Sequence, residues 1–376
     1  MRFRIPIRLL LSGLALWLLT LTTVLAEEFS IIFSASVQGE TEPCGWRTHR
    51  LGGLAKKATA IKQHQTTHPN LLILDAGDLF FHGRGLSPVE REIRLQTAKT
   101  MINGYNAIGY HAFNVAAQDF IGDLDFILEV QKTAKFPFIS ANLADSATNQ
   151  LLFQPYIIHK IGKKRFGIIG VTTAYQIPIP GVKILPVDDV LKKIIKELRK
   201  KTDYIILLAY LDRSYENEFL SKNYDVDFVL VSGSYRYSRD LEDRNNMLIA
   251  RCGNIGKYLG IIEFNLVNDK VKLTNISNKV SQISYAQKRL DSFKETAGNK
   301  SLEEYYADQP SVLNAINSMK NQVEILSIEI QQAVNPVSYD LIELDANIPD
   351  DLTIRVKLDE LKKITDKIQN QPFDLH

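Results

Sequence analysis

The residue of this sequence best placed to carry chemistry is Asp78, at the end of the run Leu71-Leu-Ile-Leu-Asp-Ala-Gly-Asp. The four leading apolar residues are typical of a buried strand, and the glycine breaks that strand just before the carboxylate. Open α/β sheets bind ligands at the carboxyl ends of their strands, so Asp78 is a candidate metal or ligand-binding residue. A structural role is the alternative, because such a carboxylate also caps a turn or pairs with a cation such as Arg236.

A strand that delivers Asp78 needs neighbours, and short apolar segments alternate with amphipathic ones across residues 29–266. Apolar residues on both faces predict buried strands, and apolar residues at spacings of three and four predict covering helices. This alternation indicates an α/β architecture. Strands are expected over 29–34, 71–74, 112–115, 136–140, 166–171, 204–208, 228–231, 247–250 and 259–266, and helices over 53–64, 89–103, 124–135 and 188–200.

The character of the chain changes near Ser281, which separates residues 27–283 from a helical region over residues 284–376. In that region Pro310 suits the first turn of a helix, and Asn335-Pro336 ends the helix. Apolar side chains repeat along it at alternating steps of four and three: Val312, Ile316, Met319, Val323, Leu326 and Ile330. Such a seam fits either a partner protein or a neighbouring element of the same chain. A strand over 337–344 and a last helix over 354–368 are expected to follow.

Residues 1–26 have the organisation of a secretory signal, with three arginines, an uncharged stretch from Leu9 to Ala26, and small residues before Glu27. We expect cleavage before Glu27 and export to the periplasm or the extracellular space. An N-terminal membrane anchor is the alternative if the segment stays uncut. Without the segment the chain has 42 basic and 43 acidic residues, a net charge of −1. That balance, with no basic stripe, argues against nucleic acid as a partner.

Seven short blocks resemble, in order and spacing, the calcineurin-like metallophosphoesterases of the 5'-nucleotidase branch. They are Ile31–Gly39 (IIFSASVQG), Leu51–Ala58 (LGGLAKKA), Leu74–Asp78 (LDAGD), Gly109–Phe113 (GYHAF), Phe136–Asn142 (FPFISAN), Phe166–Thr172 (FGIIGVT) and Cys252–Gly260 (CGNIGKYLG). The resemblance covers residues 29–267. It implies a four-layer metallophosphoesterase sandwich, in which two mixed β-sheets are flanked by helices, with a small helical C-terminal region added.

The resemblance also implies a catalytic centre that this chain does not complete. Family members hold two divalent metals about 3.5 to 4 Å apart, which a bridging carboxylate, imidazoles and an amide oxygen coordinate. Among these ligands, the bridging carboxylate is matched by Asp78. The other positions of the family's motifs hold Ser36, Gln38, Ala117, Gln118, Tyr210, Ser234 and Arg236. These side chains do not replace the expected carboxylate and imidazoles, so we expect no bound metal cofactor.

Several of the replacing residues are instead candidates for binding a ligand. Arg236, helped by backbone amides of glycine-rich turns, could hold a small anion or a phosphorylated ligand. His82, four residues beyond Asp78, is the imidazole expected nearest the old metal position. Gln38, Asp119 and Tyr210 complete the candidate set.

Cys44 and Cys252 are the two cysteines of the chain, which permits one disulfide or two separate thiols. The resemblance places both near the same strand ends, because Cys44 follows the first site loop and Cys252 begins a Gly-x-x-Gly loop. A disulfide or a near approach is therefore expected.

Three functions are consistent with these residues. The preferred one is an exported, catalytically degenerate metallophosphoesterase that acts by binding, since one carboxylate does not offset the dehydration of two divalent cations. The first alternative is an active phosphoric ester hydrolase with an altered site, using one hard cation on Asp78, Gln38 and Asp119. The second alternative is a protein-interaction module that recruits a partner through the seam of the C-terminal helix.

Overall fold

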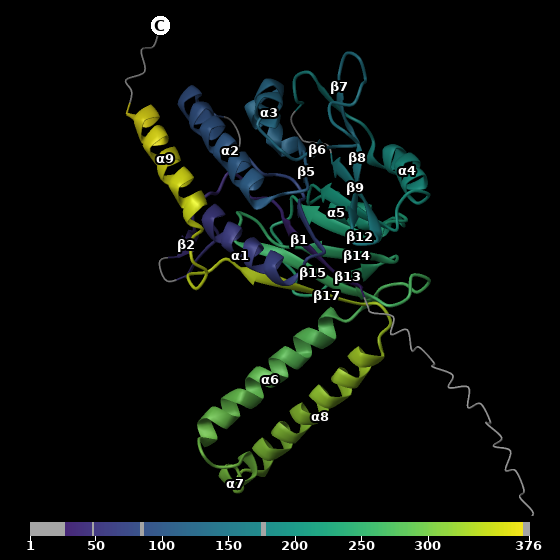
Figure 1. The fold of residues 1–376 in the computed structure, drawn as a ribbon, viewed down its shortest axis with the longest axis vertical. Helices are drawn as coiled ribbons and strands as arrows, with labels where there is room; N and C mark the ends of the chain where they lie inside the picture. Colours follow the sequence, from purple (N-terminus) through teal and green to yellow (C-terminus); the bar gives the residue numbers. More distant parts are fainter. Residues whose placement is uncertain (1–26, 47–48, 83–85, 174–177, 371–376) are drawn as a thin grey trace, which may run out of the picture.

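The computed structural model describes residues 27–46, 49–82, 86–173 and 178–370. The predicted secretory segment, residues 1–26, lies outside the described residues. Two large β-sheets pack together between helices, and a pair of long helices projects from one end of this body (Figure 1). None of the described helices combines the length and the apolar composition needed to cross a membrane.

The first sheet has seven strands in the order β16-β17-β15-β1-β4-β5-β6. Strands β1, β4, β5 and β6 are parallel, so their carboxyl ends share one edge, whereas β15 runs antiparallel to both β1 and β17. The strands are β1 (Glu27–Ser34), β4 (Leu71–Asp75), β5 (Ala112–Asn114), β6 (Phe138–Ile139), β15 (Tyr258–Leu266), β16 (Thr274–Asn275) and β17 (Pro336–Glu343).

The second sheet has six strands in the order β13-β14-β12-β11-β9-β8. Strands β9, β11, β12 and β14 are parallel, and each edge strand pairs antiparallel with its neighbour. These strands are β8 (Tyr156–Ile161), β9 (Lys164–Thr172), β11 (Tyr204–Tyr210), β12 (Phe228–Ser232), β13 (Glu242–Arg244) and β14 (Met247–Arg251). Two short antiparallel strand pairs lie outside the sheets: β2 (Cys44–Trp46) with β3 (His49–Leu51), and β7 (Leu143–Asp145) with β10 (Val182–Ile184).

The strands are apolar on both faces because each sheet is covered on both sides. Between the sheets, Phe33 and Leu74 pack with Ile168 and Leu208 in one fully buried core. Helices α1 (Leu54–Thr67), α2 (Pro88–Ile108), α3 (Leu124–Gln131) and α9 (Leu352–Gln369) cover the outer face of the first sheet. Helices α4 (Val187–Leu198) and α5 (Glu216–Ser221) cover that of the second. The predicted four-layer sandwich is confirmed.

The projecting pair of helices, here called the helical arm, comprises α6 (Ser277–Ala297), α7 (Leu302–Tyr305) and α8 (Pro310–Gln332) (Figure 1). The predicted seam of α8 faces α6, and Ile316 is completely buried in a small cluster that also holds Leu290 and Tyr306. The seam thus serves packing within the chain. A partner surface on α8 stays a prediction.

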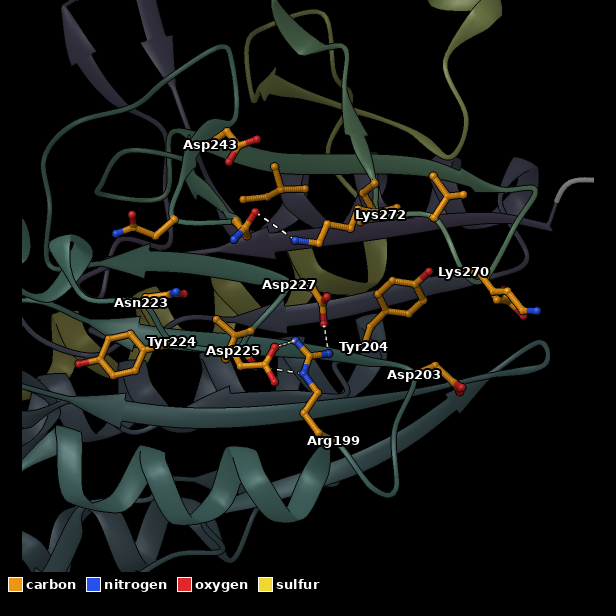
Figure 2. A pocket seen from close by; sticks show the side chains of 17 residues that line it. Arg199, Asp203, Tyr204, Asn223, Tyr224, Asp225, Asp227, Asp243, Lys270 and Lys272 are labelled. Carbon is orange, nitrogen blue, oxygen red and sulfur yellow. Dashed lines mark hydrogen bonds and ion pairs between the residues drawn. The ribbon is translucent and has the colours of Figure 1, made fainter.

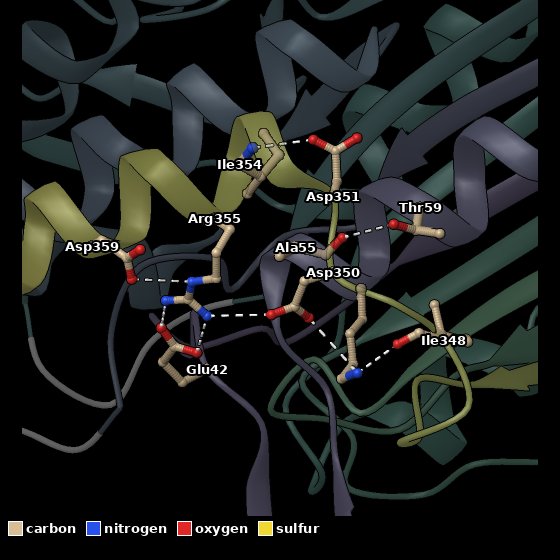
Figure 3. Close-up of polar contacts among 10 residues, drawn as sticks. Glu42, Ala55, Thr59, Ile348, Asp350, Asp351, Ile354, Arg355 and Asp359 are labelled. Atoms are coloured by element: carbon tan, nitrogen blue, oxygen red, sulfur yellow. Dashed lines mark hydrogen bonds and ion pairs between the residues drawn. The ribbon is translucent and has the colours of Figure 1, made fainter.

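The rest of the C-terminal region is part of the sandwich. Strand β17 lies inside the first sheet, and α9 lies against α1 and α2. Figure 3 shows how Arg355 of α9 binds both carboxylate oxygens of Glu42, one of them at 2.9 Å, while Asp351 caps the helix by accepting from the backbone N–H of Ile354. The predicted boundary between residues 283 and 284 falls within α6, and β17 and α9, which follow it, pack in the sandwich.

Candidate functional site

The carboxyl ends of the parallel strands of both sheets meet at one edge of the sandwich. Ser36 follows β1 and Ser232 ends β12, and their hydroxyl oxygens are 3.1 Å apart. The Ser232 hydroxyl also donates to the carbonyl oxygen of Gly77, which precedes Asp78, at 2.7 Å. The ends of strands from the two sheets therefore meet beside Asp78.

The carboxyl group of Asp78 lies at the centre of this place, with 2% of the residue's surface exposed. The Gln38 side-chain amide donates to Asp78 Oδ2 at 2.9 Å, and Asp78 Oδ1 is buried without a hydrogen-bond partner. Burial raises the pKa of Asp78 to about 7, although the Gln38 and Ser36 side chains act to lower it. Asp78 is therefore a carboxyl group that can carry a proton near neutral pH.

His82 lies beside this pair, as predicted. Its Nδ1 is 3.1 Å from Gln38 Oε1, so the imidazole N–H donates to the amide oxygen while the amide N–H₂ donates to Asp78. This chain of hydrogen bonds fixes the orientation of Gln38, with its nitrogen toward Asp78. The amide oxygen of Gln38 consequently points to His82 and not to the space beside Asp78.

Asp119 has a different role from that of Asp78. It lies on the short 3₁₀ helix η1 (Ala117–Gly122), and its carboxylate accepts the backbone N–H groups of Asp78, Leu79, Phe80 and Ala116 at 2.7 to 3.2 Å. Burial and the neighbouring Asp78 carboxylate raise the pKa of Asp119. Both its oxygens serve the loop that carries Asp78, so Asp119 is a positioning residue for that loop and does not offer a free ligand atom.

The backbone at the site is held in an unusual conformation. Ser36, Gln38 and Asp78 have φ angles of 46°, 58° and 64°, in the left-handed region that residues other than glycine, asparagine and aspartate seldom adopt. Such conformations cost on the order of 1 to 3 kcal/mol each and cluster at functional sites, where the surroundings enforce them. The surrounding hydrogen bonds therefore hold three strained residues at the strand ends.

Arg236 and Tyr210 lie on either side of the end of β12. Tyr210 is buried at the end of β11, whereas Arg236 is exposed and, within the described residues, forms no ion pair with Asp78. Arg236 instead lines a hollow of about 410 Å³ together with Arg213, Glu216, Asn217, Gly233, Ser234 and Tyr235. The pairing of Asp78 with Arg236, considered from the sequence, is not present in the structure.

Sequence reasoning missed Arg213, because it follows β11 in a loop that carries no motif. Glu216 faces the same hollow, but its carboxylate is neutralised by Arg251, whose Nη2 lies 2.7 Å away. The described residues provide no ion-pair partner for Arg213 or Arg236. The hollow thus presents two guanidinium groups to solvent beside the strand ends.

A second hollow, of about 480 Å³, lies at the amino ends of β11 and β12, far from the site (Figure 2). Its charged groups are largely paired. Arg199 binds Asp225 at 3.0 Å and Asp227 at 2.7 Å, and Lys272 donates to Asn246 at 3.1 Å. None of the predicted site residues lines this hollow.

No family model matches the chain. Among curated proteins, it is 27% identical to UshA of Escherichia coli over 319 residues, which cover 71% of this chain and 56% of UshA. It is 26% identical to a snake venom 5'-nucleotidase of Naja atra over 309 residues, which cover 73% of this chain and 52% of the venom protein. The chain is homologous to the calcineurin-like 5'-nucleotidases. It spans about half the length of the curated relatives it matches.

Solved structures share the fold of this 5'-nucleotidase-like chain. A 5'-nucleotidase precursor from Thermus thermophilus matches with a TM-score of 0.65 and 17% identity, over 92% of this chain and 60% of that one. The calcineurin-like phosphoesterase YfkN from Bacillus subtilis matches with a TM-score of 0.61 and 15% identity, over 92% of this chain and all of the other. These likenesses support the fold.

A two-metal centre does not fit the residues that this 5'-nucleotidase-like chain places at its strand ends. Two divalent cations need several anionic and imidazole ligands around them. Among the described residues, Asp78 is the carboxylate facing the site, and Gln38 turns an N–H₂ group toward it. Ser36 uses its hydroxyl to accept from the Gly233 N–H at 2.9 Å. We therefore derive no reaction step that passes through metal ions.

The two cysteines of the 5'-nucleotidase-like chain are both free thiols, so the predicted disulfide is not formed. Cys44 lies in the partly exposed strand β2. Cys252 is buried, and its backbone pairs with that of Tyr237 in an isolated antiparallel β-bridge. Burial raises the pKa of the Cys252 thiol to about 12, which makes it an inert packing residue.

A buried polar cluster lies directly beneath the site and was not predicted. Lys57 of α1 donates to the Tyr105 hydroxyl at 3.0 Å, and that hydroxyl donates to Asp75 Oδ2 at 2.8 Å. The Ser34 hydroxyl donates to the same oxygen at 2.7 Å. Burial lowers the pKa of Lys57 to about 8 and raises that of Asp75. The signal in the sequence was the position of Lys57 on the apolar face of α1, between Leu54 and Ile61.

Proposed function

We propose that the protein is an exported, catalytically degenerate metallophosphoesterase that acts by binding a small phosphorylated ligand. The observation that carries the proposal is the pairing of Asp78 with the Gln38 amide, which fills the place of the lost metal ligands with hydrogen bonds inside the chain. A domain arranged in this way keeps the fold of the hydrolases and loses the means to activate water.

The ligand site that we propose is the hollow lined by Arg213 and Arg236. Two exposed guanidinium groups suit a phosphate, because each can donate two N–H groups to its oxygens. Tyr235 lines the same hollow with an exposed ring, on which a base could stack. A nucleoside monophosphate therefore matches the chemistry of this hollow better than a neutral molecule does.

Isothermal titration calorimetry of residues 27–376 with inorganic phosphate and with AMP tests the ligand. We expect heat from both, and a loss of affinity of about tenfold or more in Arg236→Ala and in Arg213→Ala, because each removes a charge-assisted contact. Arg239→Ala is the matched control, since Arg239 is an exposed arginine outside the hollow that pairs with Glu343. An absence of heat with both ligands in the unmodified protein would contradict the proposal.

Export rests on the composition of residues 1–26. The first strand begins at Glu27, so cleavage before this residue leaves every described element in place. The periplasm or the extracellular space is accordingly the compartment that we propose.

A second candidate is a hydrolase that uses a single hard cation, and one observation favours it. Asp78 Oδ1 is buried and has no hydrogen-bond partner, which is a state that a bound cation would explain. In that case phosphate esters would be hydrolysed only with added Mg²⁺ or Ca²⁺, and Asp78→Asn would abolish the reaction.

A further inference from the structure

Two histidines and a glutamate converge at the end of the first sheet that lies away from the candidate site. His64 and His68 are one helical turn apart near the end of α1, and Glu263 lies on β15, where the register pairs it with Ser30 of β1. Ser30 and Ser36 are separated along one extended segment, so this cluster lies about 20 Å from the candidate site.

The donor atoms of these three side chains are close together. His68 Nε2 is 3.2 Å from Glu263 Oε1, and His64 Nε2 is 3.8 Å from the same oxygen. One donor atom can be chosen from each of the three residues so that all three atoms lie within 4.8 Å of one another. Tetrahedral zinc, with bonds of about 2.0 to 2.2 Å, spaces its ligand atoms about 3.3 to 3.6 Å apart. Helix α1 and strand β15 therefore hold these donor atoms at spacings close to those around a tetrahedral zinc ion.

The hydrogen bonds of His68 orient its imidazole with Nε2 toward Glu263. Its Nδ1 is 2.8 Å from Thr67 Oγ1 and 3.3 Å from the carbonyl oxygen of His64. A carbonyl can only accept, so Nδ1 donates to it, and Nε2 is the ring nitrogen that faces Glu263. A proton on Nε2 or a metal ion can join this nitrogen to the carboxylate oxygen 3.2 Å away.

A metal ion satisfies the cluster more completely than a proton does. The two imidazole rings stack with centroids 3.8 Å apart and planes 5° apart, which opposes charging both rings. His64 Nε2 is 2.9 Å from Ser30 Oγ, another oxygen beside the same point. One proton can join only one imidazole nitrogen to the Glu263 carboxylate. One divalent cation can bind all three side chains at once.

We propose that His64, His68 and Glu263 bind one zinc-class divalent cation, which fastens the last turns of α1 to the first sheet. Two imidazoles and one carboxylate suit Zn²⁺ or Co²⁺, whereas Mg²⁺ and Ca²⁺ prefer oxygen ligands alone. Spacing of four residues on one helix places both imidazoles on the same face. The site belongs to a part of the fold that the strand-end residues do not reach, and it is independent of the proposed function.

Titration of the metal-stripped protein, residues 27–376, with Co²⁺ tests this site, because cobalt absorbance reports ligand number and geometry. We expect one equivalent to bind with a tetrahedral spectrum, Zn²⁺ to displace it, and His68→Gln and Glu263→Gln each to weaken binding by more than about tenfold. His68 and Glu263 are partly exposed, so these variants are expected to fold, and thermal unfolding in EDTA checks that they do.

Two variants serve as controls. His159→Gln removes an imidazole from the other close histidine pair, with His111, whose ring centroid is 4.5 Å away. Asp78→Asn alters the strand-end site. Unchanged cobalt binding in both controls supports the assignment. No binding by the unmodified protein, or binding that survives His68→Gln and Glu263→Gln, would overturn it, and binding lost in Asp78→Asn alone would assign the metal to the strand ends.

Discussion

At the scale of single residues, Asp78 and Asp119 are neighbouring buried carboxyl groups with different uses. Asp119 accepts four backbone N–H groups, so donors already occupy both of its oxygens. Asp78 accepts from Gln38 and leaves Oδ1 unpartnered. When the pair takes up a proton, Oδ1 of Asp78 is the atom that can carry it without displacing a donor. The two residues are therefore expected to respond oppositely to removal of charge.

The change Asp78→Asn should stabilise the protein increasingly as the pH rises. The pKa of Asp78 is raised to about 7 in the folded state from 3.8, so the folded state keeps a proton that the unfolded state has lost. The contribution of the protonated carboxyl to stability is present below about pH 4 and is lost as the pH rises through about 7. From about pH 4 to about pH 8 the free energy of unfolding of the variant should gain up to about 4 kcal/mol over that of the unmodified protein. Urea denaturation measures this, and parallel pH profiles would contradict it.

The change Asp119→Asn should have the opposite sign. An asparagine leaves one oxygen for four N–H donors and turns its own N–H₂ group toward them. We expect a loss of about 2 kcal/mol or more in the free energy of unfolding at about pH 7. Asp78→Asn, measured in the same way, is the matched control, and equal effects of the two variants would refute the division of roles.

At the scale of elements, the C-terminal helix α9 packs into the core of the sandwich. Ile354, Leu358 and Leu361 are buried in the core that also holds residues of α1 and α2. Arg355 joins the helix to Glu42 in the loop between β1 and β2 (Figure 3). This loop leads from the site, so loss of α9 would disturb the first sheet and the site together.

Leu358→Ala should lower the free energy of unfolding by about 2 to 5 kcal/mol, because it opens a cavity at a side chain that is 2% exposed. Leu352→Ala is the matched control on the same helix, since Leu352 is 80% exposed and its truncation should cost less than about 0.5 kcal/mol. Chemical denaturation measures both. If α9 were an appendage outside the core, the two variants would be equally stable.

The central strands could be predicted because they are apolar on both faces. The segment Leu71 to Leu74 lies within β4, and Tyr204 to Leu208 lies within β11. The edge strand β8 was missed, since its partly exposed residues lack the pattern of a buried strand. Helix α6 begins at Ser277, before the helical region predicted over residues 284–376, because its first turns pack on β17 and carry few apolar residues.

The site could be predicted only where the family's motifs mark it. Those motifs placed Gln38 and Asp78 at neighbouring strand ends, where the structure also has them. The partners of Lys57 are Asp75 and Tyr105, which are 18 and 48 residues away in the sequence. No local sequence pattern predicts contacts between residues so far apart. A lysine is seldom buried unless paired, so its place on an apolar helix face was the available sign.

At the scale of the whole molecule, a two-sheet sandwich surrounds a site whose polar groups hydrogen-bond to one another. The strained backbone at Ser36, Gln38 and Asp78 is kept, and hydrogen bonds within the chain replace the ligands that metals would need. Two guanidinium groups beside the strand ends offer a different chemistry, the recognition of an anion. The central claim is therefore that the domain binds without hydrolysing.

The most direct test is hydrolysis of AMP and of a phosphodiester by residues 27–376, with Mn²⁺, Mg²⁺, Ca²⁺ or Zn²⁺ added, against the Asp78→Asn variant. Both proteins retain His64, His68 and Glu263, so a cation bound there affects them equally. We predict that both proteins release phosphate no faster than buffer containing the same metal. Metal-dependent hydrolysis by the unmodified protein that disappears in Asp78→Asn would contradict it.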